Sequence, residues 1–565
     1  MSEARIPVLI AGGGTVGLST ALFLAHHGVQ ALVAERQDGP SLHPRATGVG
    51  QRTVEFLREV GIEEAVNAVA VDMSGGSLGK ISVHTLAGAD LPALAETMQA
   101  QQPQGGRPAR GTGTGALRGT CPQDRLDSVL LAAARERGAT VSYRSRLMSF
   151  EQDADGVTAI LETAAGPHTV RADYLVAADG VRSGVRTALD VGTSGPGDLG
   201  NPMVNILFRA DLGTYTQGQS FVTCTITTPA APGMLVTVDA DKSWVFHAAY
   251  DPNAGQTAAD FTPERCRELI RAAIGDPALD VQVLSVLPWR VRGLVADRFQ
   301  NGRVFLAGDA AHAVPPLGAF GMNTGIADAH NLAWKLAAVL RGQAGPALLD
   351  SYQAERRPVA VLTLEQAMLR LTDPRLHWDT SPRMAPARAA AGVLNAPVVQ
   401  VGYRYDSHAV IDPRPELPSH EDADLNLDGT PGSRVPHVVV ERQGFRQSTL
   451  DLVASRFTLL TGAAGDNWIQ AAREASARLG VEVAAYRIGP EADVTDPEGR
   501  WPRAAGLTED GALLVRPDQF VAWRAPVMGA HPANDLTRAL TRLLARDQGV
   551  RRGPDGAPTA ARPGP

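Results

Sequence analysis

The first 37 residues alternate between apolar runs of strand length and one helical stretch. Residues 6–11 (IPVLIA) predict a strand, residues 18–28 (LSTALFLAHHG) predict a helix, and residues 29–37 (VQALVAERQ) predict a second strand. A strand–helix–strand segment of about 30 residues is typical of the βαβ unit, whose two strands lie parallel in one sheet. The N-terminal part of the chain therefore predicts an α/β fold.

The later parts of the chain have two other patterns. Between about 200 and 290, short alternating runs such as MVNILFRADL and SWVFHAAY are typical of an antiparallel sheet, and the chain then returns to an apolar strand, GRVFLAGD. Beyond about 400, RFTLLTG, WIQAAREASARLG, VEVAAYRIG and GALLVRPDQFVAWR predict strand, helix, strand and strand. We therefore predict a nucleotide-binding domain split over 1–190 and 290–395, an inserted domain at 191–289, a C-terminal α/β domain at 396–548 and a disordered tail at 549–565.

The composition is that of a globular protein with several domains. The 565 residues exceed what one hydrophobic core supports, and 53 Lys and Arg against 60 Asp and Glu leave a net charge of −7. An acidic balance disfavours binding to nucleic acid, because basic residues are needed to neutralise phosphates. The N-terminus lacks the pattern of a signal peptide, and no apolar run reaches the roughly 20 residues of a membrane span. We expect a cytoplasmic protein that binds neither nucleic acid nor membrane.

The three cysteines are Cys121, Cys224 and Cys266. They lie far apart in the sequence and match neither a CxxC motif nor a zinc-ligand spacing. We therefore expect three free thiols and no metal site.

A glycine motif lies directly after the first strand. Gly12, Gly14 and Gly17 form the pattern G-x-G-x-x-G where the helix begins. Such glycines permit a tight turn and let a pyrophosphate approach the positive helix N-terminus. Glu35, at the end of the second strand, lies where a carboxylate accepts hydrogen bonds from an adenosine ribose. The motif predicts a dinucleotide and leaves NAD and FAD open.

Two more strands end in an Asp–Gly or Gly–Asp pair. The strand YLVAADG ends at Asp179 and Gly180, and the strand GRVFLAGD ends at Asp309. In an open α/β sheet these strand ends meet at the same crevice. The second pair leads through PPLGAFGMN into a helix that opens near Asn323. The prolines stiffen that loop and the glycines let a flat group approach its backbone.

In this order and spacing, the three motifs resemble those of the FAD-dependent aromatic hydroxylases, the class A flavoprotein monooxygenases with the para-hydroxybenzoate hydroxylase fold. The resemblance covers about residues 1–370, and the segments TPGSRVPHVVV and LLVRPDQFVAWR extend it to the bacterial polyketide hydroxylases. It implies a split Rossmann-like FAD-binding domain, an inserted substrate-binding domain with a mainly antiparallel sheet, and a C-terminal thioredoxin-like domain. That last domain has no cysteine, so we expect a structural role for it, in a monomer or a homodimer.

The resemblance also assigns roles to single residues. Arg45 is expected near the FAD phosphates, Gln123 at the ribityl chain, Leu147 at adenine through its backbone, and Asp309 at a ribityl hydroxyl. The isoalloxazine ring is expected against PPLGAFGMN, with backbone N–H groups donating to the flavin C2 carbonyl. The full expected cofactor-binding set is Gly12, Gly14, Thr15, Val16, Gly17, Glu35, Arg36, Arg45, Gln123, Leu147, Asp179, Gly180, Asp309, Pro316, Gly321, Met322 and Asn323.

The loop departs from the family pattern at one position. The family usually has two glycines where this chain reads Gly318-Ala319. We expect the alanine methyl group to be tolerated if φ is negative at this position.

The reaction implied by the resemblance is a hydroxylation. NADPH, in preference to NADH, reduces FAD, dioxygen adds at the flavin C4a, and the hydroperoxide transfers its distal oxygen to a polycyclic aromatic phenol of the polyketide type. Baeyer–Villiger insertion or oxidative rearrangement of a polyketide, inactivation of an aromatic antibiotic by hydroxylation, and an FAD-holding protein without turnover remain open alternatives.

Activation of a phenol requires its deprotonation or a hydrogen bond that raises the electron density of the ring. The expected catalytic residues are Tyr250 on the inserted sheet, with Arg52 and Arg370 from the flavin side. Further candidates on the inserted sheet are His247, Trp289 and Arg290.

Overall fold

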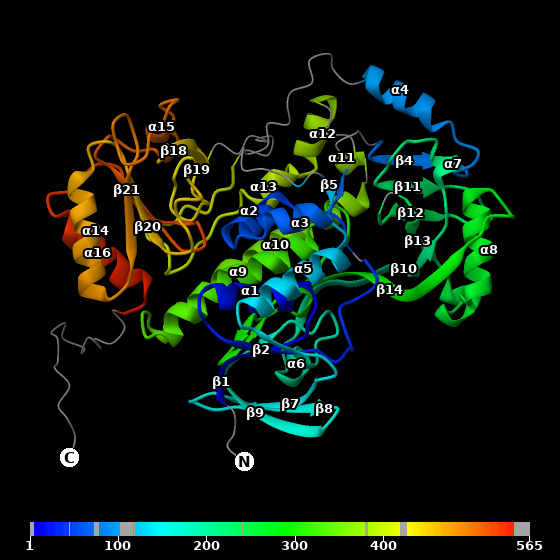
Figure 1. Cartoon of the computed structure of the whole chain (residues 1–565), viewed down its shortest axis with the longest axis horizontal. Coiled ribbons are helices and arrows are strands. Elements are labelled where there is room, and N and C mark those ends of the chain that lie inside the picture. The colour runs from blue at the N-terminus through cyan, green and yellow to red at the C-terminus, as the bar shows by residue number, and fades with distance from the viewer. Residues whose placement is uncertain are drawn as a thin grey trace.

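The computed structural model describes residues 5–44, 46–72, 78–101, 117, 119–239, 241–373, 375–378, 382–418 and 427–546. In Figure 1 the chain forms three bodies in a row: the C-terminal domain at the left, a mixed sheet with its helices in the middle, and an antiparallel sheet at the right. The long helices α9 (Gly321–Leu340) and α10 (Asp350–Thr372) run through the middle body.

The sheet of the middle body has the strand order β15-β16-β9-β1-β2-β6. β1 (Arg5–Ala11) pairs in parallel with β2 (Ala31–Ala34) and with β9 (Gly166–Ala177), and β9 pairs in parallel with β16 (Val304–Leu306). The predicted βαβ unit is therefore confirmed. Helix α1 (Thr15–His26) connects β1 to β2 and is apolar on most sides, because it packs between the sheet and α9. The remaining elements of this body are α2 (Gln51–Glu59), α3 (Glu63–Val69), β3 (Val71–Asp72), β5 (Gly119–Thr120), α5 (Gln123–Glu136), β6 (Thr140–Ser142), α6 (Gly184–Ala188) and β15 (Gln300–Asn301).

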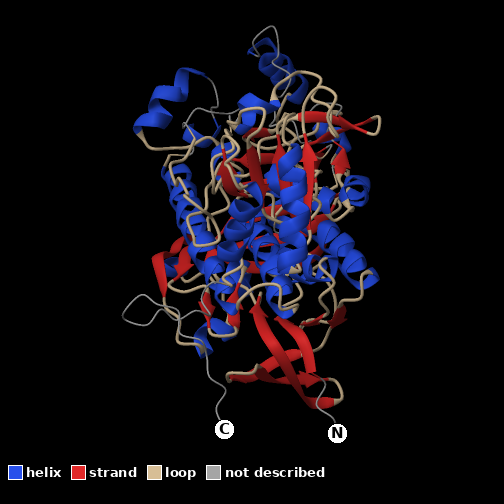
Figure 2. Cartoon of the chain, turned by 90° about the vertical axis from the view of Figure 1, so that its left-hand side faces the viewer, coloured by secondary structure: helices blue, strands red, loops and turns tan. Residues whose placement is uncertain are grey.

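The edge strands β7 (Arg146–Gln152) and β8 (Val157–Thr163) extend this sheet through the first half of β9. They project at the bottom of the molecule, which Figure 2 shows as red strands below the helices.

The antiparallel sheet has seven strands in the order β17-β14-β10-β13-β12-β11-β4. Helix α8 (Pro263–Ile274) covers one face, where Val204, Phe208, Phe246 and Ile270 lie in one buried cluster. Strand residues alternate between faces, so the other face is turned away from α8. The elements are β4 (Lys80–Val83), α4 (Leu91–Gln101), β10 (Thr193–Arg209), α7 (Gly213–Thr216), β11 (Thr223–Ile226), β12 (Gly233–Thr237), β13 (Ser243–Ala249), β14 (Gln282–Ala296) and β17 (His312–Ala313).

Two strands of this sheet, β4 and β17, come from outside the segment 191–289. β4 lies within the stretch 1–190 that the sequence assigns to the nucleotide-binding domain, but it pairs with β11. The reason is the apolar pattern of β4: Ile81 and Val83 are buried in the same cluster as Cys224. This is a correction to the predicted boundaries, and β14 also runs beyond 289.

The C-terminal domain has a four-stranded sheet in the order β21-β20-β22-β23. β20 (Phe457–Thr461) and β21 (Val483–Arg487) are parallel, whereas β22 (Ala512–Val515) and β23 (Val521–Ala525) are antiparallel to their neighbours. Helices α14 (Asp466–Leu479) and α16 (Pro532–Leu543) pack together, and this is the thioredoxin-like arrangement that was predicted. The other elements of this domain are β18 (Val439–Arg442), β19 (Phe445–Ser448) and α15 (Trp501–Ala505). The helices α11 (Arg375–Trp378), α12 (Ala385–Ala390) and α13 (Ala396–Gln400) lie over the middle body in Figure 1.

The segment GALLVRPDQFVAWR differs from the predicted single strand. It forms β22 and β23 joined by a tight turn, in which Gln519 has a φ of +68° and its N–H donates to Arg516 O. This turn enters the middle body of the molecule.

Candidate active site

Three neighbouring strands of the mixed sheet end at one edge. β16, β9 and β1 are adjacent, and they lead into Gly308-Asp309, Asp179-Gly180 and the glycine motif at Gly12. The structure thus brings the three sequence motifs together at the carboxyl ends of parallel strands, where ligands of open α/β sheets bind.

The three motif glycines serve different purposes. Gly12 has a φ of +104°, and a Cβ at Gly12 would overlap Ala178 O; a Cβ at Gly17 would overlap Gly12 O. These two glycines are required by packing alone. Gly14 has an ordinary φ of −80°, and a Cβ there would meet no described atom within 4 Å. The open side of Gly14, at the N-terminus of α1, is therefore the surface available to a pyrophosphate.

Val16 packs the first motif against the third. A Cβ on Gly308 or on Gly325 would come within 2.6 Å of Val16 Cγ2. Both glycines let the strand end and helix α9 approach α1 closely. Val16 therefore has a packing role beside its predicted place in the cofactor site.

The adenosine end of the predicted site is preorganised by hydrogen bonds. Gly13 N–H donates to Glu35 Oε2 at 2.6 Å, and Gln37 N–H donates to Glu35 Oε1 at 2.8 Å. Ser145 N–H donates to Glu35 O at 2.9 Å, which places the start of β7, with Leu147, beside the acidic residue. Arg36 is exposed to solvent next to Glu35.

A second chain of hydrogen bonds links α5 to α1. Gln123 Nε2 donates to Thr15 Oγ1 at 2.8 Å, and Thr15 Oγ1 donates to Asp127 Oδ1 at 2.5 Å. Gln123 N–H donates to Ala46 O. Gln123 and Thr15 therefore lie together at the N-termini of two helices, as expected for residues that share one ligand. Arg45, the residue before Ala46, lies outside the described residues.

The two acidic strand ends differ in their surroundings. Asp179 Oδ2 accepts from Val185 N–H at 3.2 Å, whereas the buried Asp179 Oδ1 has no partner among the described residues. Arg186 donates to Ala310 O and Val181 O and so ties the two strand ends together. Asp309 is exposed at the same edge. A buried carboxylate oxygen without a partner is costly unless a ligand supplies a donor.

The loop before α9 is fixed by the side chain of Asn323. Its Oδ1 accepts from Gly50 N–H at 2.8 Å and from Thr53 Oγ1 at 2.7 Å, and its Nδ2 donates to Gly48 O and Ala319 O. Because the side chain is fully used, Asn323 can offer a ligand only its backbone. α9 begins at Gly321, so the N–H groups of Gly321, Met322 and Asn323 belong to its first turn, which has no intrahelical acceptors.

Ala319 does not meet the condition of a negative φ under which an alanine is tolerated without strain. Its φ is +55°, a left-handed conformation that favours glycine. The Ala319 N–H donates to Pro316 O and closes a tight turn in which Gly318 also has a positive φ, of +102°. Pro316 itself is exposed.

A buried carboxylate on α9 supports the end of β16. Asp328 Oδ2 accepts from His312 Nε2 at 2.7 Å and from Gly308 N–H at 3.1 Å, and Asp328 Oδ1 accepts from Arg356 Nε at 2.7 Å. Burial by itself would raise the pKa of Asp328, but His312 and Arg356 outweigh burial and hold that pKa below its ordinary value. Asp328 therefore remains ionised and fixes the loop that carries Asp309.

The predicted catalytic residues lie in three different places. Arg52 is buried, with Nη1 donating to Glu55 and Gln519 and Nη2 donating to Asp518 O. Arg370 donates to Gln366 and Leu394 O, and its guanidinium lies 5.1 Å from the centre of the Phe320 ring, next to the α9 loop. Tyr250 follows β13 and packs its ring against Phe261. The structure does not bring these three side chains together, and their catalytic roles remain predictions.

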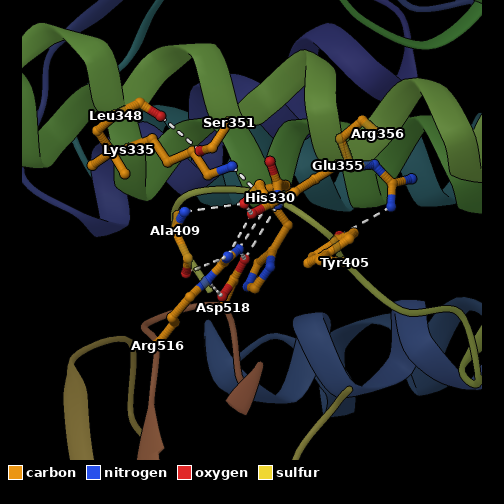
Figure 3. A network of polar contacts seen from close by, with 12 residues as sticks. His330, Lys335, Leu348, Ser351, Glu355, Arg356, Tyr405, Ala409, Arg516 and Asp518 are labelled. Atoms are coloured by element: carbon orange, nitrogen blue, oxygen red, sulfur yellow. Dashed lines mark hydrogen bonds and ion pairs between the residues drawn. The ribbon is translucent and has the colours of Figure 1, made fainter. Parts of the chain in front are cut away.

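The C-terminal domain reaches this region through the β22–β23 turn. Figure 3 shows Arg516 and Asp518 of the turn below helices α9 and α10, on the side of the helices where Glu355 lies. Arg516 donates to both oxygens of Glu355, at 2.5 and 2.8 Å, and Lys335 Nζ donates to Glu355 Oε2 at 2.7 Å. All four charged side chains are buried. The same turn holds Arg52, so the C-terminal domain braces α2 and through it Asn323.

Sequence reasoning missed Asp328, Arg356 and Arg516. The signal for Asp328 is a charged residue within an otherwise apolar helix, MNTGIADAHNLAWKL, since a buried charge needs a partner. For Arg516 no local signal exists, because its partner Glu355 comes from a distant helix.

These residues fit a flavin dinucleotide. The open side of Gly14 and the unpartnered oxygen of Asp179 follow the ends of the adjacent strands β1 and β9, and the chain runs from the end of the next strand, β16, to the first turn of α9. Residues 5–367 match the family model of the FAD binding domain, and residues 428–546 match that of the aromatic-ring hydroxylase C-terminal domain. The chain belongs to the FAD-dependent aromatic-ring hydroxylases.

Several relatives resemble the hydroxylase over its whole length. It is 41% identical to tetracenomycin A2 monooxygenase-dioxygenase of Streptomyces glaucescens, over 97% of this chain and 99% of that one. It is 39% identical to aklavinone 12-hydroxylase RdmE of Streptomyces purpurascens, over 97% and 100%. The crystal structure of aklavinone-11 hydroxylase with FAD and aklavinone matches with a TM-score of 0.83 and 38% identity, over 97% and 100%. The predicted family, fold class and FAD cofactor are confirmed.

The described residues form neither a metal-binding cluster nor a membrane-spanning helix. Among them, no group of three or more His, Cys, Asp or Glu side chains is suited to hold a metal ion. None of the helices found in the described ranges has the length and apolar character needed to cross a bilayer. Cys121, Cys224 and Cys266 are free and buried, and burial raises the pKa of each thiol, to about 12, 12 and 11.

Proposed function

We propose that the hydroxylase inserts one atom of dioxygen into a phenolic ring of a polycyclic, polyketide-type aromatic compound, with NADPH as the electron donor. The observation that carries this proposal is the junction between the two sheets. β17 pairs with β14 of the antiparallel sheet and leads directly through the Pro316 loop into α9. A flavin at the first turn of α9 is therefore adjacent to the sheet. The names of the relatives, which act on tetracenomycin A2 and aklavinone, support this substrate class.

The chain's own residues hold the cofactor. Gly12, Gly14 and the first turn of α1 receive the pyrophosphate, and Glu35 accepts from the ribose hydroxyls. Gln123 and Asp309 receive the ribityl chain. When bound, FAD supplies the electron transfer and oxygen activation that the protein lacks.

The first turn of α9 stabilises negative charge at its N-terminus. Its N–H groups and the helix dipole favour an anion there, and the hydrogen bonds of Asn323 hold them in place without reorganisation. The antiparallel sheet supplies the wall that excludes water from the reacting ring.

NADPH docks on the surface and leaves, since the described residues form no second nucleotide-binding fold beside the first. The sequence repeats the glycine spacing at Gly195, Gly197 and Gly200, but these residues lie within β10. All three have positive φ and produce bulges against β14, so this second match bends a strand and opens no helix. We place the reaction in the cytoplasm, where NADPH is available.

The test begins with the visible spectrum of the purified protein. We expect flavin absorbance, NADPH oxidation that a polycyclic phenol accelerates, and a product that carries one ¹⁸O atom when the gas is ¹⁸O₂. NADH and H₂¹⁸O are the matched controls for the donor and the oxygen source. A yellow protein whose NADPH consumption no phenol changes would contradict the proposal and favour a binding protein. An oxygen inserted between two carbons would instead favour a Baeyer–Villiger reaction.

A further inference from the structure

Three buried polar atoms on the antiparallel sheet lack partners among the described residues. They are Asn205 Oδ1 on β10, His247 Nδ1 on β13 and Trp289 Nε1 on β14. The Asn205 side chain is only 4% exposed. Other buried side-chain atoms of the described residues also lack partners, but these three lie together on adjacent strands, where one ligand can supply the missing hydrogen bonds to all of them.

The three side chains share the sheet face that is turned away from α8. Asn205 pairs directly with His247, and Met203, two residues earlier on the same face, pairs with Trp289. The rings of His247 and Trp289 are 6.0 Å apart at 73°, which confirms that they are neighbours. We call Asn205, His247 and Trp289 the polar triad.

The surroundings of the polar triad are apolar. Met203 and Leu287 lie on the same face of β10 and β14, and Met234 of β12 pairs with His247. All three side chains are half-buried. Thioethers pack well against aromatic rings, so this face suits a flat aromatic molecule with one polar edge.

The polar triad lies close to the flavin side of the molecule. His43 Nε2 lies 3.0 Å from Asn205 O. A few residues after His43, Gly48 and Gly50 form hydrogen bonds with Asn323, in the first turn of α9. One short segment therefore separates the polar triad from the loop that receives the flavin ring.

We propose that the polar triad binds the phenolic hydroxyl of the aromatic substrate, with Asn205 Oδ1 accepting its hydrogen and Trp289 Nε1 donating to its oxygen. This assignment rests on the proposed function and adds the residues that select the substrate. A hydroxyl is both donor and acceptor, so one group satisfies a donor-only indole and an amide oxygen together. A methoxy group has no hydrogen to donate to the amide oxygen, and an unsubstituted ring position forms neither hydrogen bond.

His247 takes part as a neutral hydrogen-bonding group. Burial, with a further contribution from the neighbouring His43, lowers the pKa of His247 to about 4. A phenol has a pKa near 10, so His247 is too weak a base to remove its proton in the resting complex. His247 instead strengthens, as a neutral neighbour, the hydrogen bond that the phenol donates to Asn205 Oδ1. That hydrogen bond polarises the phenol and raises the electron density of its ring.

The test uses three flat probes that differ at one position: 2-hydroxyanthraquinone, 2-methoxyanthraquinone and anthraquinone. Each is titrated into FAD-loaded protein without NADPH, and the dissociation constant is read from the quenching of intrinsic fluorescence. The wild type is expected to prefer the hydroxy probe over the methoxy probe, and the methoxy probe over anthraquinone. Loss of one buried hydrogen bond corresponds to a factor of about five to a hundred in affinity.

Each variant is expected to remove one preference. Asn205→Leu removes the acceptor and should abolish the preference for hydroxy over methoxy. Trp289→Phe removes only the N–H and should abolish the preference for methoxy over anthraquinone. His247→Phe should raise the dissociation constant of the hydroxy probe, and His247→Gln should return it toward the wild-type value.

Trp244→Phe is the matched control for the tryptophan variant. Trp244 is on the opposite face of β13, and its Nε1 donates to Ala210 O in the α8 core. Its replacement should leave all three dissociation constants unchanged.

Two results would overturn the assignment: equal affinity of the wild type for the three probes, or an unchanged hydroxy-to-methoxy ratio in Asn205→Leu. Because the titration needs neither NADPH nor turnover, its outcome is separate from that of the proposed function. If the protein discriminates between the probes but never hydroxylates a phenol, the assignment of the polar triad stands and the proposed hydroxylation is contradicted.

Discussion

Arg516 Nη1 lies 2.5 Å from Glu355 Oε1, although 161 residues separate the two in the sequence. This ion pair joins the β22–β23 turn of the C-terminal domain to helix α10, and both side chains are fully buried. Lys335 and Asp518 complete the cluster with one more charge of each sign. Buried charges are tolerated only when every member is paired, so the cluster acts as one unit.

Replacement of one charged residue of this cluster should therefore disrupt more than one ion pair. Glu355→Gln leaves Lys335 and Arg516 with a single buried carboxylate, and we expect the free energy of unfolding to fall by about 3–5 kcal/mol. Urea unfolding followed by tryptophan fluorescence measures this. Glu264→Gln is the control, because Glu264 pairs with Arg267 on the exposed side of α8. Equal stability of the two variants would show that the cluster does not hold the domains together.

The order of the secondary structure elements could be predicted from local patterns. The βαβ unit, the antiparallel strands and the C-terminal α/β unit follow from the period of apolar residues and from the glycine motifs. The thioredoxin-like character of that last unit was implied only by the resemblance to the hydroxylase family. The assignment of β4 to its sheet could not be predicted, because an edge strand of four residues has the same pattern in either sheet. Only the burial of Ile81 beside β11 decides it.

The cofactor-binding part of the candidate site was more predictable from the sequence than the proposed substrate-binding part. The glycines and the acidic strand ends are local motifs with a mechanical reason, and the structure brings them to one edge. The polar triad depends on cross-strand pairing: Asn205 resembles any strand residue until β13 and β14 place His247 and Trp289 beside it. Arg52 was placed near the flavin, but its partners Asp518 and Gln519 lie in another domain.

Alanine substitutions in the glycine motif should distinguish an effect on FAD binding from an effect on folding. In Gly14→Ala the new methyl group meets no described atom within 4 Å and φ is already −80°, so the protein should fold normally. The methyl group occupies the side that receives the pyrophosphate, and we expect FAD affinity to fall by about tenfold or more, roughly the loss of 1.4 kcal/mol. Titration of the apoprotein with FAD, read by quenching of flavin fluorescence, gives the dissociation constant.

Gly17→Ala is the contrasting variant. Its Cβ would overlap Gly12 O, so the protein should fail to fold, and circular dichroism should report the loss. A Gly14→Ala protein that retains FAD with wild-type affinity would contradict the assigned pyrophosphate site.

Ala319 is strained, and its replacement by glycine should relieve that strain. A left-handed φ of +55° costs an alanine about 1 kcal/mol relative to glycine. We therefore expect Ala319→Gly to raise the free energy of unfolding by about that amount. Ala477→Gly, at an exposed position of helix α14, should lower it by about 1 kcal/mol. Opposite signs in chemical unfolding check the prediction, and a loss of stability in both variants would contradict it.

His247 should make the protein sensitive to acid within a defined range. Its pKa is lowered by burial to about 4 in the folded protein, whereas an unfolded histidine titrates near 6.5. Between these values the unfolded chain binds a proton that the folded protein does not, so stability falls as pH drops from about 6.5 to about 4, by at most about 3 kcal/mol. Above pH 6.5 both forms are neutral and the contribution to stability is complete. His247→Gln removes this titration, so the difference in unfolding free energy between wild type and variant should change from pH 7 to pH 4.5. If that difference stays constant over the range, His247 is not buried as a neutral group.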